Sequence, residues 1–357
     1  FDIDVTYDGT TYTENVTGVS IASLATYNVD FSDAFTLIPG LNEISATVSN
    51  VNVVDSDDDG ADDTKSVSLN PIVPAAGKVV VGEEATGTWC GWCPRGAVYL
   101  DKMNDLYPEH FIGIAVHNGD PMTVEPYDLA IGDYISGYPS MLVDRGADID
   151  PSAVEGDFLD RIVIAPKAVL TVGSDYVDGA TSMNVSVTAD FLEGISGDYR
   201  LALVVIEDGV TGTGSGYNQV NYYSGGGSGV MGGYESLPNP VPASDMVYNH
   251  VARMILPSFN GMAGSFPATV AAGESHTVSF VVAIDPAWNL DEVHLVGILI
   301  AADAKIDNAG FVNMDEAALN GYVSLDEEVT VLSSTNLYPN PTHDNTIIDL
   351  GNLSNEN

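Results

Sequence analysis

Cysteine, positive charge and long apolar runs are scarce in this sequence, and each shortage limits the classes of protein to which the chain can belong. Only two cysteines, Cys90 and Cys93, occur in 357 residues, which fits an exported protein that does not rely on many disulfides. No run of about 18 apolar residues occurs, so no transmembrane helix is expected. Hydrophobic residues still make up 45% of the chain, which permits buried cores in more than one domain.

The shortage of positive charge is the strongest global feature. Ten lysines and arginines oppose 51 acidic residues, which gives a formal net charge of -41. Nucleic acid and anionic membranes repel such a surface, so neither is expected as a direct partner. The same acidic field favours solubility and the binding of cations.

The two cysteines form a CxxC pair in the stretch GTWCGWCPRG, residues 87–96. A zinc site built on this pair needs two more ligands, and the six histidines show no metal spacing such as HxxxH. The pair is therefore expected to be either a redox centre or a structural disulfide. Both alternatives stay open at the level of sequence.

Residues 1–75 alternate apolar and polar side chains in short segments separated by turns, for example at Asp8-Gly9. This pattern predicts an immunoglobulin-like β-sandwich. Only about five strand patterns are present, whereas a full sandwich has about seven. We therefore expect a partial sandwich, with one or two further strands upstream and an open sheet edge that another chain can complete.

An acidic loop, DSDDDGADD at residues 55–63, interrupts the last strands of this segment. Asp55, Asp57, Asp59 and Asp63 occupy positions 1, 3, 5 and 9 of a calcium-loop pattern. Position 12, which takes a bidentate Glu, is Ser66, and no helical pattern flanks the loop. The loop is either a calcium site or an acidic hairpin turn.

Residues 76–165 alternate strand and helix patterns, which predicts a small α/β domain. Residues 166–333 return to β patterns and predict a second, larger β-sandwich. A long insertion rich in Gly and Tyr, residues 211–246, is expected to cover one end of that sandwich or to bind partners. The chain is thus expected to be multidomain and mostly β.

The CxxC pair follows an apolar strand pattern and opens a helix pattern. A helix N-terminus stabilises a thiolate, which is the form that attacks disulfides. Cys90 is then the expected nucleophile and Cys93 the resolving thiol. Arg95 adds positive charge nearby.

The segment WCGWC resembles the WCGxC of thioredoxin-like proteins, and GYPSMLVDR resembles the stretch around their cis-proline. The resemblance implies a cis bond between Tyr138 and Pro139, with Pro139 orienting the substrate chain. It also implies that Glu84, six residues before Cys90, is the buried acid that accepts a proton from Cys93. The chain departs from the family at Trp92 and Pro94, which leaves the activity open although the fold is expected.

A wider resemblance covers residues 76–330. EEATGTWCGWCPRGAVYLD, NQVNYY and VYNHVARMIL resemble an outer-membrane surface-protein family of Bacteroidota that joins a thioredoxin-like module to a β-sandwich. LYPNPT, in residues 334–357, resembles the start of the sorting domain that the type IX secretion machinery reads. The resemblance implies export across the outer membrane to the cell surface or the medium.

Two functions follow from these patterns. The first is a non-catalytic surface protein with a structural, adhesive or assembly role, which is favoured because a catalyst would not need two large sandwiches. The alternative is a secreted thiol–disulfide oxidoreductase or redox chaperone that uses Cys90, Cys93, Glu84 and Pro139. Apart from calcium and a Cys90–Cys93 disulfide, no cofactor is expected.

Overall fold

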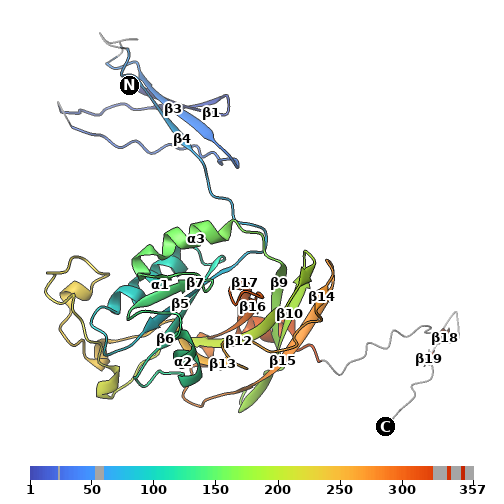
Figure 1. Cartoon of the computed structure of the whole chain (residues 1–357). Helices are drawn as coiled ribbons and strands as arrows, with labels where there is room; N and C mark the ends of the chain where they lie inside the picture. Colours follow the sequence, from blue (N-terminus) through green and yellow to red (C-terminus); the bar gives the residue numbers. More distant parts are fainter. Residues whose placement is uncertain (23–24, 53–59, 325–335, 339–346, 350–357) are drawn as a thin grey trace. The chain divides into compact units, whose positions relative to one another are not determined.

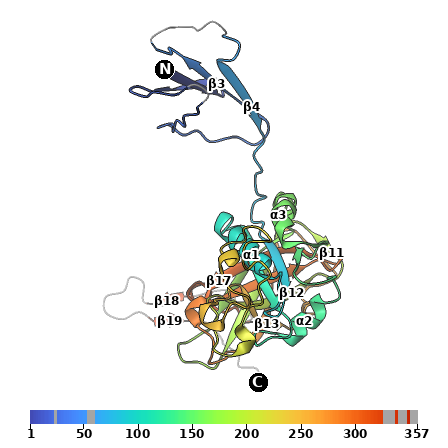
Figure 2. The ribbon, with the colours of Figure 1, turned by 90° about the vertical axis from the view of Figure 1, so that its left-hand side faces the viewer.

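A computed structural model describes residues 1–22, 25–52, 60–324, 336–338 and 347–349 of the chain (Figures 1 and 2). The chain divides into two compact units. One unit comprises residues 1–76 and 159–165, and the other comprises residues 77–158 and 166–357. Within the described ranges, no helix combines the length and apolar character needed to cross a membrane.

The first unit contains one antiparallel sheet of four strands. These strands are β1 (Asp2–Tyr7), β2 (Thr10–Asn15), β3 (Asn42–Ser49) and β4 (Thr64–Leu69), in the order β2-β1-β3-β4. Asp8 and Gly9 both have positive φ, as a two-residue hairpin between β1 and β2 requires, so the turn predicted there is confirmed. The described part of this unit shows a single sheet, and the second sheet of a sandwich stays a prediction.

Few side chains are buried in this first unit. Tyr7 is buried, and its hydroxyl donates to the side-chain oxygen of Asn42 at 2.5 Å. Phe35, from the long β2–β3 connection, stacks on the Tyr7 ring with a centroid distance of 4.7 Å. One small aromatic cluster therefore holds the connection against the sheet.

Residues 77–165 contain alternating strands and helices that agree with the patterns of residues 76–165. These elements are β5 (Val80–Thr86), α1 (Pro94–Leu106), β6 (Phe111–His117), α2 (Glu125–Ile131), β7 (Ser140–Val143), β8 (Asp148–Ile149), η1 (Pro151–Ala153) and α3 (Val154–Ile162). β5 and β6 are parallel, and β7 runs antiparallel to β5. The side chain of Asp150 accepts a hydrogen bond from Ser152 N and caps η1, and Pro151 occupies the first position of η1.

The remaining elements are mostly strands. They are β9 (Ala168–Ser174), β10 (Ser182–Phe191), β11 (Ile195–Ser196), β12 (Arg200–Glu207), η2 (Ser215–Tyr217), η3 (Tyr234–Ser236), η4 (Ala243–Asp245), β13 (Val251–Leu256), β14 (Thr269–Val270), β15 (Ser275–Ala283), η5 (Leu290–Glu292), β16 (Val293–Ile300), β17 (Ile306–Asn313), α4 (Met314–Asn320), β18 (Asn336–Tyr338) and β19 (Ile347–Asp349). The chain is multidomain and mostly β, as its sequence predicts.

One eight-stranded sheet runs through the second unit in the order β17-β16-β12-β13-β6-β5-β7-β8 (Figure 1). β13 and β6 meet in a parallel bridge between Val251 and Ala115. This sheet contains strands from both sides of the boundary predicted at residue 165. The boundary itself stays a prediction, but hydrogen bonds of one sheet cross it.

The two faces of β12 show how this sheet is packed. Leu201, Leu203 and Val205 lie in a core shared with the three-stranded sheet β15-β10-β9, which forms a sandwich. Ala202, Val204 and Ile206 point to the other face and share a core with α2. A strand that is buried on both faces is apolar throughout, which explains the continuous run LALVVI.

Contacts between the start and the end of this unit fasten β5 to β17. The side chain of Asn308 accepts a hydrogen bond from Val79 N at 2.9 Å and donates to Gly77 O at 2.9 Å. Lys78 Nζ donates to the backbone oxygen of Asp307 at 2.7 Å and pairs with buried Asp144. The CxxC segment that follows β5 is therefore anchored to strands far away in the sequence.

Candidate functional site

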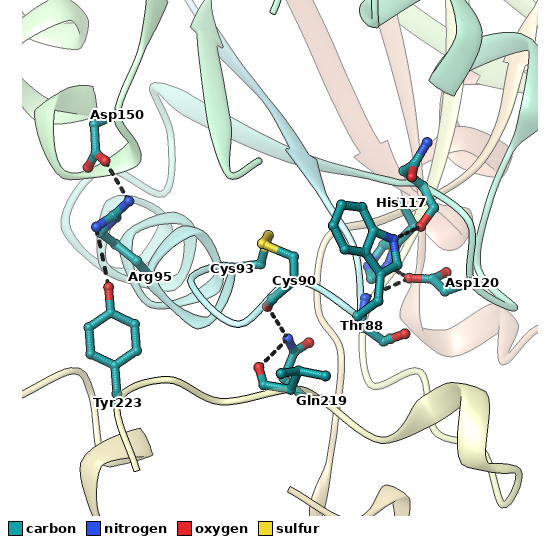
Figure 3. The surroundings of a disulfide bond; sticks show 12 residues. Thr88, Cys90, Cys93, Arg95, His117, Asp120, Asp150, Gln219 and Tyr223 are labelled. Carbon is teal, nitrogen blue, oxygen red and sulfur yellow. Dashed lines mark hydrogen bonds and ion pairs between the residues drawn. A yellow bond between two sulfur atoms is a disulfide. The ribbon is translucent and has the colours of Figure 1, made fainter. Parts of the chain in front are cut away.

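Cys90 and Cys93 are joined in a disulfide at the junction of β5 and α1 (Figure 3). Cys93 is the N-cap residue of α1, and Pro94 occupies its first turn, where a missing N–H has no cost. Cys90 is 5% exposed and Cys93 is 2% exposed. The pair predicted to be the redox centre is thus bonded and largely shielded from solvent.

Glu84 is buried behind the disulfide, on the face of β5 that α1 covers. A Cβ atom at Gly96, in the first turn of α1, would lie 1.6 Å from Glu84 Oε1, so the missing side chain of Gly96 makes room for this carboxyl. Burial raises the pKa of Glu84 from its ordinary value of 4.5 to about 8, a hydrogen bond with Thr86 opposes the rise, and the charge of Asp101 adds to it. In the described part of the chain, Oε1 has no hydrogen-bond partner.

The neighbouring acid, Glu83, has opposite surroundings. Successive side chains of a strand point to opposite faces, and Glu83 lies on the α2 side of β5. Arg145 Nε pairs with it at 3.0 Å, and the Tyr127 hydroxyl donates to it at 2.6 Å. The two adjacent buried carboxyls therefore have different surroundings. Glu83 is paired with the Arg145 guanidinium, whereas Glu84 has no cationic partner among the described residues.

A cavity of about 50 Å³ lies between Glu84 and Cys93. Asp101 and His250 also line it, and Asp101 Oδ1 lies 3.2 Å from His250 Nε2. The full lining consists of Glu84, Thr86, Cys93, Pro94, Ala97, Leu100, Asp101, Ala115, His117, Gln219, Tyr234, Val247, Tyr248, Asn249 and His250. This volume can hold at least one water molecule in a cavity that the Glu84 carboxyl lines.

His117, at the end of β6, is a satisfied polar residue. Its Nδ1 lies 2.7 Å from a carboxylate oxygen of buried Asp120, which also accepts a hydrogen bond from Thr88 N (Figure 3). The contact fixes the turn that leads into the CxxC pair.

Pro139 lies at the start of β7, and the Tyr138–Pro139 bond is cis, as the resemblance implies. The ring of Tyr138 contacts the edge of Trp89 at a centroid distance of 5.3 Å. Trp89 immediately precedes Cys90 and donates its indole N–H to Asn118 O at 2.7 Å. The structure therefore brings the Tyr138–Pro139 loop beside the CxxC turn.

The positive charge expected from Arg95 is compensated. Its guanidinium pairs with Asp150 at 2.6 Å and donates to the Tyr223 hydroxyl at 3.3 Å (Figure 3). Asp150 is thus both the cap of η1 and the counter-ion of Arg95. Little of this positive charge remains to stabilise a thiolate.

Sequence reasoning missed the contribution of the Gly/Tyr insertion to this site. We call residues 216–241 the strap. The strap does not simply cover an end of the sandwich, because Gln219, Val220 and Tyr222 donate hydrogen bonds to the CxxC turn. Glycines and tyrosines have no periodicity that points to a contact surface, and only their clustering marks the segment as unusual.

Most of the predicted calcium loop lies outside the described residues, which include Asp63 but not Asp55, Asp57 or Asp59. Elsewhere in the described ranges, no group of three or more His, Cys, Asp or Glu residues is arranged to hold a metal ion. Calcium binding at residues 55–63 stays a prediction.

A family model described as outer membrane protein Omp28 matches residues 130–321, which is more than half of the chain. No curated protein matches the sequence. Among solved structures, HBP35 of Porphyromonas gingivalis is similar to this chain at 18% sequence identity, with 76% of this chain and 84% of that chain covered and a TM-score of 0.51.

A second solved structure, protein AGR_C_4864 from Agrobacterium tumefaciens, is 14% identical. The alignment covers 70% of this chain and 98% of that chain with a TM-score of 0.39, which is too low to support an argument. The likeness to the Porphyromonas gingivalis protein shows a shared fold, and the family model shows kinship over residues 130–321.

Proposed function

The chain belongs to the outer membrane protein Omp28 family, and we propose that it is an exported surface protein with a structural, adhesive or assembly role built around a thioredoxin-like module. Its location is the cell surface or the outer membrane. Export by the type IX machinery is part of the proposal and rests on the resemblance of LYPNPT in residues 334–357.

The arrangement of residues 77–158 supports the thioredoxin-like part of the proposal. The sheet order β6-β5-β7-β8 combines a parallel strand pair with two antiparallel pairs. The CxxC pair lies between β5 and α1, and a cis-proline precedes β7. These are the positions that the family resemblance assigns to Cys90, Cys93 and Pro139.

The observation that carries the non-catalytic role is the shielding of the disulfide. Attack on a substrate needs an exposed thiolate, because the incoming disulfide must approach the sulfur in line. Cys90, the expected nucleophile, is 5% exposed, and Gln219 of the strap donates to its backbone oxygen at 2.9 Å. This disulfide is therefore suited to stiffening the β5–α1 turn.

Insulin reduction by the purified protein with a small dithiol as electron source tests this role. We expect a rate equal to that of the dithiol alone and equal to that of the Cys90→Ser/Cys93→Ser double variant. A clear acceleration that disappears in the double variant would overturn the proposal. Circular dichroism of the variant checks that it is folded.

Glu84 favours one second candidate, the thiol–disulfide oxidoreductase or redox chaperone. In the reduced protein, a Cys90 thiolate would attack a substrate disulfide and release one substrate thiolate. Glu84 would take the proton of Cys93, and the Cys93 thiolate would displace the second substrate thiolate and re-form the Cys90–Cys93 disulfide. The Oε1 atom of Glu84, which has no hydrogen-bond partner among the described residues, and the cavity that Glu84 shares with Cys93 support this role.

Trapping of mixed disulfides tests this second candidate. If the protein is an oxidoreductase, the reduced Cys93→Ser variant should form mixed disulfides at Cys90 when it is mixed with disulfide-containing surface proteins. The matched Cys90→Ser variant should accumulate none. Equal and low labelling of both variants would exclude this activity.

The edge strands of the first unit support assembly with other protein chains. All six residues of β4 are exposed, including the apolar side chains of Val67 and Leu69. An exposed edge strand with apolar side chains can pair with a strand of another chain. Ser66 lies between two residues whose N–H groups bind β3, so its own N–H faces the open edge. We expect Ser66→Pro to abolish such pairing, which light scattering and surface-binding assays would measure, and identical behaviour of wild type and variant would count against this edge.

A further inference from the structure

The strap donates hydrogen bonds to three backbone carbonyl groups of the CxxC turn. Val220 N donates to Thr88 O at 2.8 Å, and Tyr222 N donates to Gly91 O at 2.9 Å. Between them, Gln219 Nε2 donates to Cys90 O at 2.9 Å (Figure 3). Three carbonyl groups within four residues of the turn therefore have their partners in one distant segment.

Trp92, which lies within the ring that the disulfide closes, is also held by the strap. The rings of Tyr222 and Tyr223 contact it edge-on, with centroid distances of 5.4 and 5.3 Å. Next to it, a Cβ atom at Gly91 would lie 2.5 Å from the Tyr222 ring, so the ring packs directly on the glycine backbone. The partners of the strap in these contacts all belong to the CxxC turn. Their positions, and so these contacts, depend on the conformation of that turn.

Backbone hydrogen bonds hold the two ends of the strap together. Gln219 and Val241 exchange backbone hydrogen bonds of 3.0 and 2.8 Å, which tie the two ends of residues 219–241 together. Within this loop, Gln219 and Tyr234 line the cavity that contains Glu84. The strap is thus a lid on the cavity as well as a partner of the turn.

We propose that the strap is redox-linked: the intact Cys90–Cys93 disulfide holds it closed, and reduction by a dithiol releases it and opens the cavity behind Cys93. In this reaction the dithiol loses two electrons and two protons and becomes a disulfide, while Cys90 and Cys93 become thiols. The turn is then no longer closed by a covalent bond, and its carbonyl groups and Trp92 can leave the positions that the strap requires.

The coupling works in both directions. If the oxidised turn binds the strap more tightly than the reduced turn does, then the closed strap must stabilise the disulfide by the same factor. Weakening the strap should therefore make the disulfide easier to reduce. This regulation rests on the shielded disulfide of the proposed function, but it does not require catalytic turnover.

Hydrogen exchange of the full chain, oxidised and after reduction with dithiothreitol, tests the release. We expect the amides of Val220 and Tyr222 to exchange at least about tenfold faster in the reduced protein, while those of β10 and β12 keep their protection. Equal exchange of the strap amides in the two states would overturn the proposal. Loss of protection in β10 as well would also overturn it, because the opening would then be global.

A redox titration against dithiothreitol tests the reverse direction. Gln219→Ala removes the hydrogen bond to Cys90 O, and we expect it to raise the equilibrium constant for reduction by roughly two- to tenfold, the range for one hydrogen bond. Val230→Ala is the matched control, since Val230 belongs to the strap but is 82% exposed. Equal constants for Gln219→Ala and wild type would refute the coupling.

The two proposals fail separately. Insulin turnover by the wild-type protein would remove the non-catalytic role and leave the strap coupling standing. Unchanged strap exchange on reduction would remove the coupling and leave the surface role standing.

Discussion

Glu84 should make the stability of the second unit depend on pH in an unusual direction. Most carboxyls in folded proteins have lowered or ordinary pKa values, whereas burial raises that of Glu84 from 4.5 to about 8. The folded protein therefore keeps the Glu84 proton in a pH range in which the unfolded chain has lost it. Stability from this group is fully present below pH 4.5 and is lost as the pH rises to about 8.

The size of the effect follows from the two values. The difference between 4.5 and about 8, at about 1.4 kcal/mol per pH unit, amounts to about 5 kcal/mol in the free energy of unfolding. Glu84→Gln replaces the carboxyl by a neutral amide of the same shape. The variant should therefore gain stability relative to wild type by about 1.4 kcal/mol for each pH unit between 5 and 8.

Urea unfolding followed by tryptophan fluorescence measures this difference, because all three tryptophans lie in the second unit. The disulfide is kept oxidised, and each pH is measured for wild type, Glu84→Gln and the control Glu109→Gln, whose side chain is exposed. Other titrating groups cancel in the comparison of variant with wild type. A difference between Glu84→Gln and wild type that stays constant from pH 5 to pH 8 would refute the reasoning.

Three further perturbations probe the packing around the site and in the first unit. Gly96→Ala should lower the free energy of unfolding by about 3 kcal/mol, because its methyl group would overlap Glu84 Oε1, and adding Glu84→Ala should restore most of the loss. Arg145→Met should cost about 3–5 kcal/mol in the same urea assay, because it leaves Glu83 buried without its cation; a second change, Glu83→Gln, should recover more than half of that. Phe35→Ala should destabilise the first unit by about 2 kcal/mol, and near-ultraviolet circular dichroism of the tyrosines in that unit would show an earlier transition than in wild type.

Local sequence signals predicted the elements of the second unit well. The alternating strand and helix patterns of residues 76–165 correspond to β5, α1, β6, α2, β7 and α3. These elements are fixed by periodicity and capping, which are properties of neighbouring residues. The resemblance to thioredoxin-like proteins pointed to Glu84 as a buried acid, but the absence of a partner for its Oε1 among the described residues depends on other segments.

Pairings between distant segments were not predictable from these signals. A strand that is apolar on both faces, such as β12, has no polar alternation that would fix its neighbours or register. The bridge between Val251 and Ala115 joins residues that are 136 positions apart in the sequence, and the strap contacts the CxxC turn across a similar distance. Such contacts depend on three-dimensional complementarity, which composition and periodicity do not describe.

The contacts that fasten β5 to β17 determine how early during synthesis the second unit can complete its folding. Lys78 and Asp307 are 229 residues apart, and at about 5–20 residues per second a ribosome needs on the order of 10–50 seconds to synthesise the intervening chain. During this interval the buried ammonium group of Lys78 has no β17 carbonyl to bind. The first half of the unit therefore cannot complete this contact until β17 has been synthesised.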